Sequence, residues 1–161
     1  MDAEQNWISL AREFGYEGAA VVVCNSSDKI LFLLSEKDGK PQAEIAGGKV
    51  ERIDQGNPRL TAIRELKEEA GIELSLDDLT LVEMKTTGGT TGMPSMQYLT
   101  KPMDDAIQPI KMESKFTGTA WSKVYHPSPK EWFIEGKIPI RKFNTFFLSQ
   151  NEAVLGERFY Q

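Results

Sequence analysis

The chain has 161 residues, of which 40% are hydrophobic and 27% are charged, and this composition excludes the weakly hydrophobic class of disordered proteins. A formal net charge of -5 provides no basic surface for bulk nucleic acid, and a single cysteine, Cys24, excludes an internal disulfide or a cysteine-based zinc site. The longest apolar run, at residues 19–24, is too short to span a bilayer, and the N-terminus has no signal-peptide pattern, so we expect a cytoplasmic protein without a membrane partner.

The first third of the chain is predicted to fold as a helix followed by short strands. Apolar residues recur at helical spacing over residues 2–14, and a Gly-Tyr-Glu-Gly stretch ends that helix. Two aliphatic runs at 19–24 and 30–34 flank a polar turn and predict a hairpin. A weaker strand at 42–45 leads into Gly47 and Gly48, which let the backbone turn tightly and expose a carbonyl or amide to a ligand.

The strongest helix prediction covers residues 57–70. Asn57 suits the N-cap, Pro58 the first helical position and Gly71 the C-terminal stop. Further strands are predicted at 79–85, 96–100 and 117–121, and a last helix at 140–149. No linker divides these elements, so we expect one domain over residues 1–161 with a mixed α/β sandwich fold.

Three glutamates of the central helix are predicted to converge. At about 100° per residue, Glu65, Glu68 and Glu69 fall within an arc of roughly 100° opposite the apolar face of the helix. A solvated helix face is the simpler alternative, with Arg64 and Glu68 paired at i,i+4. A hard divalent cation explains the clustering better, because Mg²⁺ prefers carboxylate oxygens and keeps waters and phosphates in its other positions.

Residues 47–72, GGKVERIDQGNPRLTAIRELKEEAGI, resemble the signature of the Nudix hydrolases. That signature is Gly, five residues, Glu, seven residues, Arg-Glu, an aliphatic residue, any residue, Glu-Glu, any residue, Gly and an aliphatic residue. Its second half is matched without a gap by Arg64, Glu65, Leu66, Glu68, Glu69, Gly71 and Ile72.

The first half of the signature departs from the family pattern by two residues. Counting back from Arg64, the position of the first glutamate holds Gly56, whereas counting forward from Gly48 places Asp54 there. A two-residue insertion accounts for both results. Asp54 therefore either replaces the missing glutamate or is a loop residue, and the sequence leaves both interpretations open.

The resemblance implies a fold, an activity and a set of site residues. The fold is a Nudix-type α/β/α sandwich with a mixed central sheet, and a homodimer is compatible with it. The activity is Mg²⁺- or Mn²⁺-dependent hydrolysis of a nucleoside diphosphate linked to another group. The implied metal ligands are Glu68, Glu69, the Gly47 carbonyl and Glu65, which is alternatively the base, while Arg64 orients the carboxylates.

The catalytic base and the substrate contacts are less sharply defined. Many Nudix proteins use an acid on a later loop as the base, and Glu113 is our candidate, with Asp104 and Asp105 as rivals. The Gly- and Thr-rich stretch 86–95 is a candidate substrate loop, and the predicted substrate contacts are Gly48, Lys49, Thr90 and Thr91. His126 is interpreted as a surface residue in a turn.

The resemblance ranks nucleotide-derived small molecules as substrates. ADP-ribose-like compounds and nucleotide sugars come first, followed by nucleoside triphosphates and dinucleoside polyphosphates. Two other classes of function compete: a Nudix-fold nucleotide-binding or regulatory protein with poor turnover, and an acidic structural domain. Retention of all three helix glutamates favours the enzyme.

Overall fold

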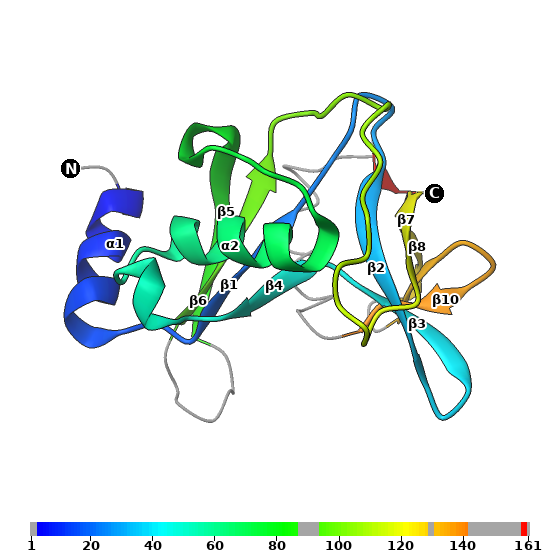
Figure 1. Ribbon diagram of the computed structural model, residues 1–161, viewed down its shortest axis with the longest axis horizontal. Helices are drawn as coiled ribbons and strands as arrows, with labels where there is room; N and C mark the ends of the chain where they lie inside the picture. Colours follow the sequence, from blue (N-terminus) through cyan, green and yellow to red (C-terminus); the bar gives the residue numbers. More distant parts are fainter. Residues whose placement is uncertain (1–2, 87–93, 129–130, 142–158, 161) are drawn as a thin grey trace.

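The computed structural model describes residues 3–86, 94–128, 131–141 and 159–160, and Figure 1 shows their arrangement. The α-helices are α1 (Ala3–Phe14) and α2 (Pro58–Ala70), and short 3₁₀ turns form η1 (Arg52–Asp54) and η2 (Leu76–Asp78). The strands are β1 (Gly18–Val22), β2 (Ile30–Lys37), β3 (Lys40–Glu44), β4 (Ala46–Lys49), β5 (Leu79–Thr86), β6 (Pro94–Thr100), β7 (Gly118–Ser122), β8 (Tyr125–Ser128), β9 (Glu131–Ile134) and β10 (Ile138–Pro139).

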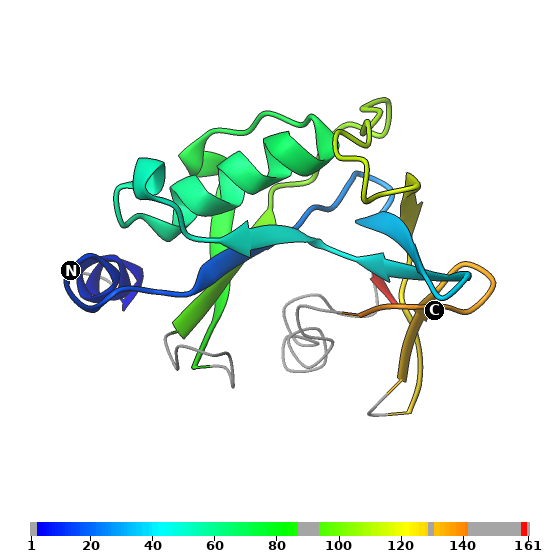
Figure 2. The ribbon, with the colours of Figure 1, turned by 60° about the horizontal axis from the view of Figure 1, so that its bottom comes forward.

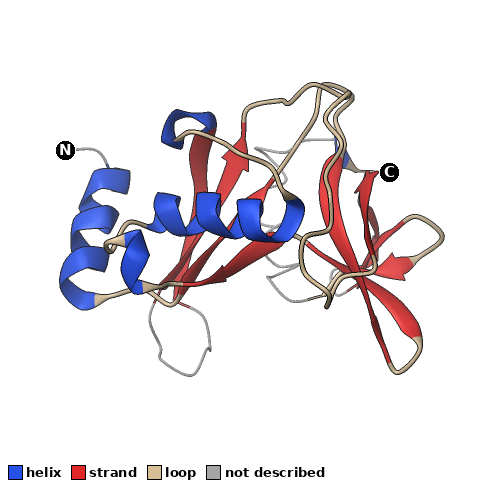
Figure 3. Cartoon of the chain, viewed as in Figure 1, coloured by secondary structure: helices blue, strands red, loops and turns tan. Residues whose placement is uncertain are grey.

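The central sheet is mixed, as the sequence predicts. Its strand order is β4-β1-β6-β5, with β1 parallel to β6 and antiparallel to β4. Two three-stranded sheets, β3-β2-β7 and β10-β9-β8, make up the other part of the described fold. Figure 3 shows that the helices gather around the four-stranded sheet, while the part that contains β2, β3 and β7 consists of strands and loops.

Helix α2 covers one face of the four-stranded sheet, which is visible in Figure 2. Ala62 and Leu66 of α2 are fully buried and belong to the same apolar cluster as Val21 of β1 and Tyr98 of β6. A second apolar cluster, which includes Val22 of β1, lies on the opposite face. Because β1 is buried on both faces, its residues are apolar without alternation.

The ends of α2 follow the predicted capping residues. The side-chain oxygen of Asn57 accepts a hydrogen bond of 3.0 Å from the Arg59 amide, and Pro58 occupies the first helical turn. Gly71 ends the helix with a φ of +68°, a left-handed conformation that glycine adopts at little cost. The predicted helix over 57–70 is therefore confirmed.

Two predictions about neighbouring strands hold only in part. The runs 19–24 and 30–34 are joined by a hairpin turn, with an antiparallel bridge between Cys24 and Ile30 and a hydrogen bond of 2.9 Å from the Leu31 amide to the Val23 carbonyl. The ladder extends no further, because β4 and β6 occupy both edges of β1 and β2 enters a different sheet. Gly47 and Gly48 do not form a turn but lie within β4.

The C-terminal region also differs from the prediction. The stretch around His126 is strand β8 rather than a turn, and the His126 ring stacks on Trp132 with ring centroids 3.7 Å apart. The predicted helix at 140–149 lies, from residue 142 on, outside the described residues. Within the described residues, no helix is long and apolar enough to cross a membrane.

Candidate metal centre

Three carboxylates converge at one end of α2. Glu65, Glu69 and Glu113 each offer an oxygen, and these oxygens lie within 4.8 Å of one another. Glu65 and Glu69 come from successive turns of α2, as the predicted helix face requires. Glu113 comes from the loop that precedes β7, which is fixed to the C-terminal end of α2 by a backbone hydrogen bond of 3.2 Å from Met112 to the Glu69 carbonyl.

The carboxylates lie in an environment that disfavours their negative charge. Burial raises the pKa of Glu69 to about 7, and although the Gly47 amide and Lys115 oppose this shift, Glu65 and Glu113 add to it. Burial also raises the pKa of Glu65, against the effect of Arg64. A bound cation would remove this electrostatic cost.

The two glycines of β4 let the strand approach the carboxylates closely. The Gly47 amide donates a hydrogen bond of 2.8 Å to Oε1 of Glu69. A Cβ atom on Gly48 would lie 2.3 Å from the carboxyl carbon of Glu65, so no larger residue fits there without displacing that side chain. The glycines therefore bring the backbone of β4 close to the carboxylates without forming a tight turn.

Arg64 positions the carboxylates from the side of the cluster. Its Nε and Nη2 donate to the two oxygens of Asp54 at 2.8 and 2.9 Å, and its Nη1 donates to Glu65 at 3.0 Å. Nη2 also donates to the Lys49 carbonyl of β4 at 3.0 Å. The Asp54 hydrogen bond, reinforced by the charges of Asp54 and Glu65, outweighs burial and raises the pKa of Arg64, so the guanidinium remains charged and links α2 to η1 and β4.

The surroundings of Asp54 favour one of the two interpretations that the shifted signature leaves open. Its side chain is buried and also accepts hydrogen bonds from the Thr61 hydroxyl at 2.7 Å and from the Glu51 amide at 2.9 Å. Gly56, at the position expected to hold glutamate, has a φ of +71° that favours glycine. Asp54 therefore provides the acidic partner of Arg64 and is not a solvated loop residue.

The other predicted site residues lie in different places. Glu68 is outside the cluster: its side chain is 49% exposed, compared with 1% for Glu69, and it pairs with Arg64 at 3.2 Å. Asp105 accepts hydrogen bonds from the amide and hydroxyl of Ser27. Asp104 accepts from the Ala106 amide at 2.8 Å. These two rivals of Glu113 thus stabilise turns rather than join the cluster.

Of the predicted substrate contacts, Gly48 and Lys49 lie in β4 next to the cluster, while Thr90 and Thr91 lie outside the described residues. Sequence reasoning missed Lys115. Its ammonium lies 3.6 Å from Oε2 of Glu69 and 3.8 Å from Oε2 of Glu113. The only sequence signal for Lys115 was that Glu113 lies between two lysines, Lys111 and Lys115. The sequence does not show which of these side chains faces α2.

The residues of the cluster fit a hard divalent cation. All three donors are carboxylate oxygens, which Mg²⁺ and Mn²⁺ prefer, and Lys115 places a positive charge at the same position. The identity of the metal remains a prediction from the resemblance.

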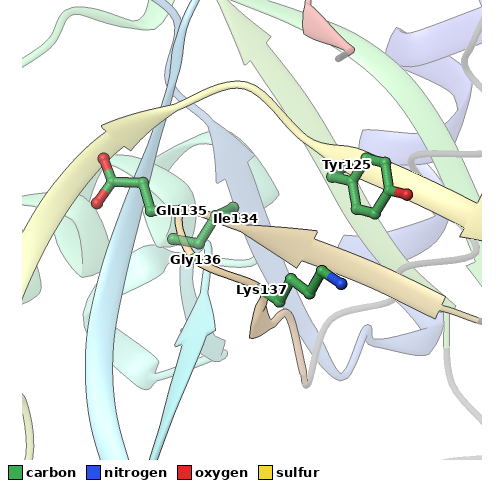
Figure 4. Close-up of a pocket in the computed structure, with 5 residues that line it drawn as sticks. All are labelled: Tyr125, Ile134, Glu135, Gly136 and Lys137. Carbon is green, nitrogen blue, oxygen red and sulfur yellow. The ribbon is translucent and has the colours of Figure 1, made fainter.

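Two of the hollows in the described part of the molecule differ in their position relative to the carboxylates. One, of about 220 Å³, is lined in part by Lys115 and thus borders the carboxylates. The other, of about 330 Å³, is formed by Tyr125 and the turn between β9 and β10. Figure 4 shows that the Glu135 carboxylate points away from Tyr125, and this second hollow shares no residue with the cluster.

Comparison with known proteins identifies the family. The model of the NUDIX domain matches residues 16–130. The chain therefore belongs to the NUDIX domain family, as the resemblance of residues 47–72 to the Nudix signature implies. No curated protein matches the sequence.

Solved structures share the fold at low sequence identity. A MutT/nudix family protein from Enterococcus faecalis is 16% identical, with a TM-score of 0.54 over 74% of this chain and 48% of that one, so the match spans about half of its length. A MutT structure described for Aliivibrio salmonicida and Vibrio cholerae is 20% identical, with a TM-score of 0.51 over 65% of this chain and 77% of that one. The MERS1 protein from T. brucei is 13% identical, with a TM-score of 0.52 over 65% and 56%.

Proposed function

We propose that this protein is a metal-dependent hydrolase that cleaves the pyrophosphate bond of a nucleoside diphosphate linked to another group. The observation that carries the proposal is the convergence of Glu65, Glu69 and Glu113, with oxygens within 4.8 Å of one another. Glu65 and Glu69 would hold Mg²⁺ or Mn²⁺, with Glu68 at the exposed edge and the Gly47 carbonyl as further ligands. A bound ion would neutralise the negative charge of the pyrophosphate and lower the pKa of a bound water.

The residues of the chain divide the remaining tasks. Arg64 holds Glu65 in place while Asp54 holds Arg64, and the Gly47 amide fixes one oxygen of Glu69. Glu113 is the acid that we assign to take the proton from the attacking water. Its carboxylate belongs to the cluster but is partly exposed, whereas Glu65 is already bound by Arg64.

We rank ADP-ribose and nucleotide sugars first among the substrates, and nucleoside triphosphates and dinucleoside polyphosphates next. The alternative function, a nucleotide-binding protein with weak turnover, depended on the shifted first half of the signature. Because Asp54 gives Arg64 an acidic partner at that point, the same feature supports an enzyme.

The test is release of AMP or phosphate from a panel of these substrates with Mg²⁺ or Mn²⁺. We expect Glu65→Gln, Glu69→Gln and Glu113→Gln each to lower kcat by about 100-fold or more, since each removes a charge from the site. Glu68→Gln should cost less, because that side chain lies at the edge.

The matched control is Glu73→Gln, which changes an exposed glutamate paired with Lys67 outside the cluster. Turnover that survives all three cluster substitutions would rule out the proposed site. Saturable nucleotide binding without turnover in the unmodified protein would favour the alternative function.

A further inference from the structure

The hollow of about 220 Å³ beside the carboxylates has a strongly polar lining. It lies between the β2–β3 hairpin, the turn that follows Glu113, and the chain after β10. The polar residues that line it are Ser35, Glu36, Gln42, Glu44, Lys115 and Arg141.

Lys115 joins this hollow to the reaction centre. The same side chain lines the hollow and lies 3.6 Å from Glu69 and 3.8 Å from Glu113. The turn is fixed by backbone hydrogen bonds from Phe116 to Glu113 at 3.1 Å and from Thr117 to Leu34 of β2 at 2.8 Å. If the pyrophosphate of a substrate binds at the carboxylates, the part of the substrate next to Lys115 therefore lies beside the hollow.

The far wall is also held in a defined position. Arg141 donates a hydrogen bond of 2.8 Å from Nη1 to Oε1 of Gln42, and its amide donates to the Ala43 carbonyl at 2.8 Å. Ser35 and Gln42 are direct partners across the β2–β3 ladder, so their side chains lie on the same face of it.

The chemistry of the lining selects the kind of group that fits. Lys115 and Arg141 offer charged donors for phosphate oxygens, whereas Ser35, Gln42 and Glu44 offer acceptors for hydroxyl groups. The aromatic residue of the lining, Phe116, is buried and its ring faces the Lys115 ammonium 5.0 Å away, so it offers no open face for a nucleobase. A group rich in hydroxyls and attached to a phosphate satisfies both sets of partners.

We infer that this hollow binds the sugar attached to the far phosphate of the substrate, so that the preferred substrates are nucleoside diphosphates linked to ribose or a hexose. The inference rests on the proposed function for the position of the pyrophosphate. It distinguishes such substrates from nucleoside triphosphates, which carry no sugar beyond the terminal phosphate.

The first experiment compares kcat/KM for ADP-ribose with kcat/KM for ATP in the full-length protein. Loss of one partner of the sugar hydroxyls in Glu44→Gln, Ser35→Ala or Gln42→Leu should lower the ratio of the two values by about tenfold or more, which corresponds to about 1.4 kcal/mol. Arg52→Met, a change at an exposed arginine in η1, is the control and should leave the ratio as it is. Thermal unfolding identifies any variant that fails to fold, and Ser35→Ala is the mildest of the three.

The second experiment measures binding of ribose 5-phosphate by calorimetry, with AMP as the comparison. We expect binding of ribose 5-phosphate to weaken in the three variants more than binding of AMP does. The binding measurement tests the sugar site even if the protein hydrolyses none of the substrates. In that case the proposed function is wrong, but binding of ribose 5-phosphate still supports the sugar site. Equal losses for ADP-ribose and ATP in a folded variant, or no binding of ribose 5-phosphate by the unmodified protein, would overturn the inference.

Discussion

At the scale of single residues, the contact between Asp54 and Arg64 is the basis of our prediction that Asp54 replaces the missing glutamate of the signature. Asp54 accepts four hydrogen bonds from three residues and ties η1 to α2. We predict that Asp54→Asn lowers the free energy of unfolding by about 3 kcal/mol, because an amide leaves the Arg64 charge without its buried partner. Turnover should fall as well, since Arg64 also holds Glu65.

Urea unfolding and steady-state assays check this prediction, with Asp77→Asn at an exposed position as the control. If Asp54→Asn matched the control in both stability and turnover, Asp54 would have no supporting role.

The same residue predicts how stability depends on pH. Burial opposes ionisation of Asp54, but hydrogen bonds from Arg64, Thr61 and the Glu51 backbone outweigh it and hold the pKa below the usual 3.8. A carboxylate with a depressed folded-state pKa stabilises the fold above its unfolded pKa and loses this contribution as the pH falls through the folded value. The difference in unfolding free energy between wild type and Asp54→Asn should therefore shrink as the pH is lowered below about 4. A difference that stays constant from neutral pH to pH 3, measured by urea unfolding, would contradict it.

At the scale of elements, strand β4 contains two glycines with different constraints. A Cβ on Gly47 would lie 2.8 Å from the backbone of Ala19 and Ala20, whereas a Cβ on Gly48 would meet the movable end of Glu65. We predict that Gly47→Ala costs about 1–3 kcal/mol of stability through overpacking. Gly48→Ala should cost less stability but reduce turnover, because Glu65 has to leave its position.

The two glycine variants serve as controls for each other when thermal unfolding and kcat are measured in parallel. If Gly47→Ala and Gly48→Ala changed thermal stability and kcat to the same extent, the proposed division between a packing role for Gly47 and a role at the site for Gly48 would be wrong.

Buried Gln97 of β6 provides a second prediction for an element. Its side chain is fully buried, and within the described residues neither amide atom has a hydrogen-bond partner. Replacement by the similarly shaped but apolar Met should raise stability by about 1–3 kcal/mol, because it removes an unsatisfied polar group. The exposed Gln108→Met is the control. A destabilised Gln97→Met variant in chemical denaturation would show that the amide has a partner.

The elements that the sequence predicted well are those with local signals. Asn57, Pro58 and Gly71 set the ends of α2 through contacts within a few residues, so its bounds were predictable. Strand β4 was not, since its Ala-Gly-Gly-Lys sequence has low strand propensity and is held by pairing with β1. Strands β8 and β10 were missed because Pro127 and Pro139 indicate turns, although proline is tolerated at sheet edges.

The site was predictable in part for a similar reason. Helical spacing brings Glu65, Glu68 and Glu69 to one side of α2, but it does not show which of them faces the sheet. That choice depends on where β4 and the loop with Glu113 lie, and these are contacts between distant parts of the chain. The role of Lys115 depends on the same long-range packing.

At the scale of the whole molecule, Arg59 links α1 to the region matched by the family model, which begins at residue 16. Arg59 forms an ion pair with Glu4 of α1, donates to the Leu79 carbonyl at 2.8 Å, and lies 5.3 Å from the centre of the Tyr98 ring. The guanidinium thus connects α1, α2 and the start of β5 above the central sheet. Each of these contacts is polar and depends on one side chain, so we expect α1 to detach from the rest of the fold when that side chain is replaced.

We predict that Arg59→Met lowers the free energy of unfolding by about 1–3 kcal/mol, since it leaves Glu4 and the carbonyls of Leu76 and Leu79 without their donor. Hydrogen exchange of amides in Ala3–Phe14 should accelerate more than exchange in β1 and β6, and turnover should persist because the cluster lies at the other end of α2. The exposed Arg52→Met is the control, and it should leave exchange in α1 as it is in the wild type. If α1 kept its protection in Arg59→Met, the helix would be held by its apolar side instead, and the ion pair with Glu4 would contribute no more than an exposed salt bridge does.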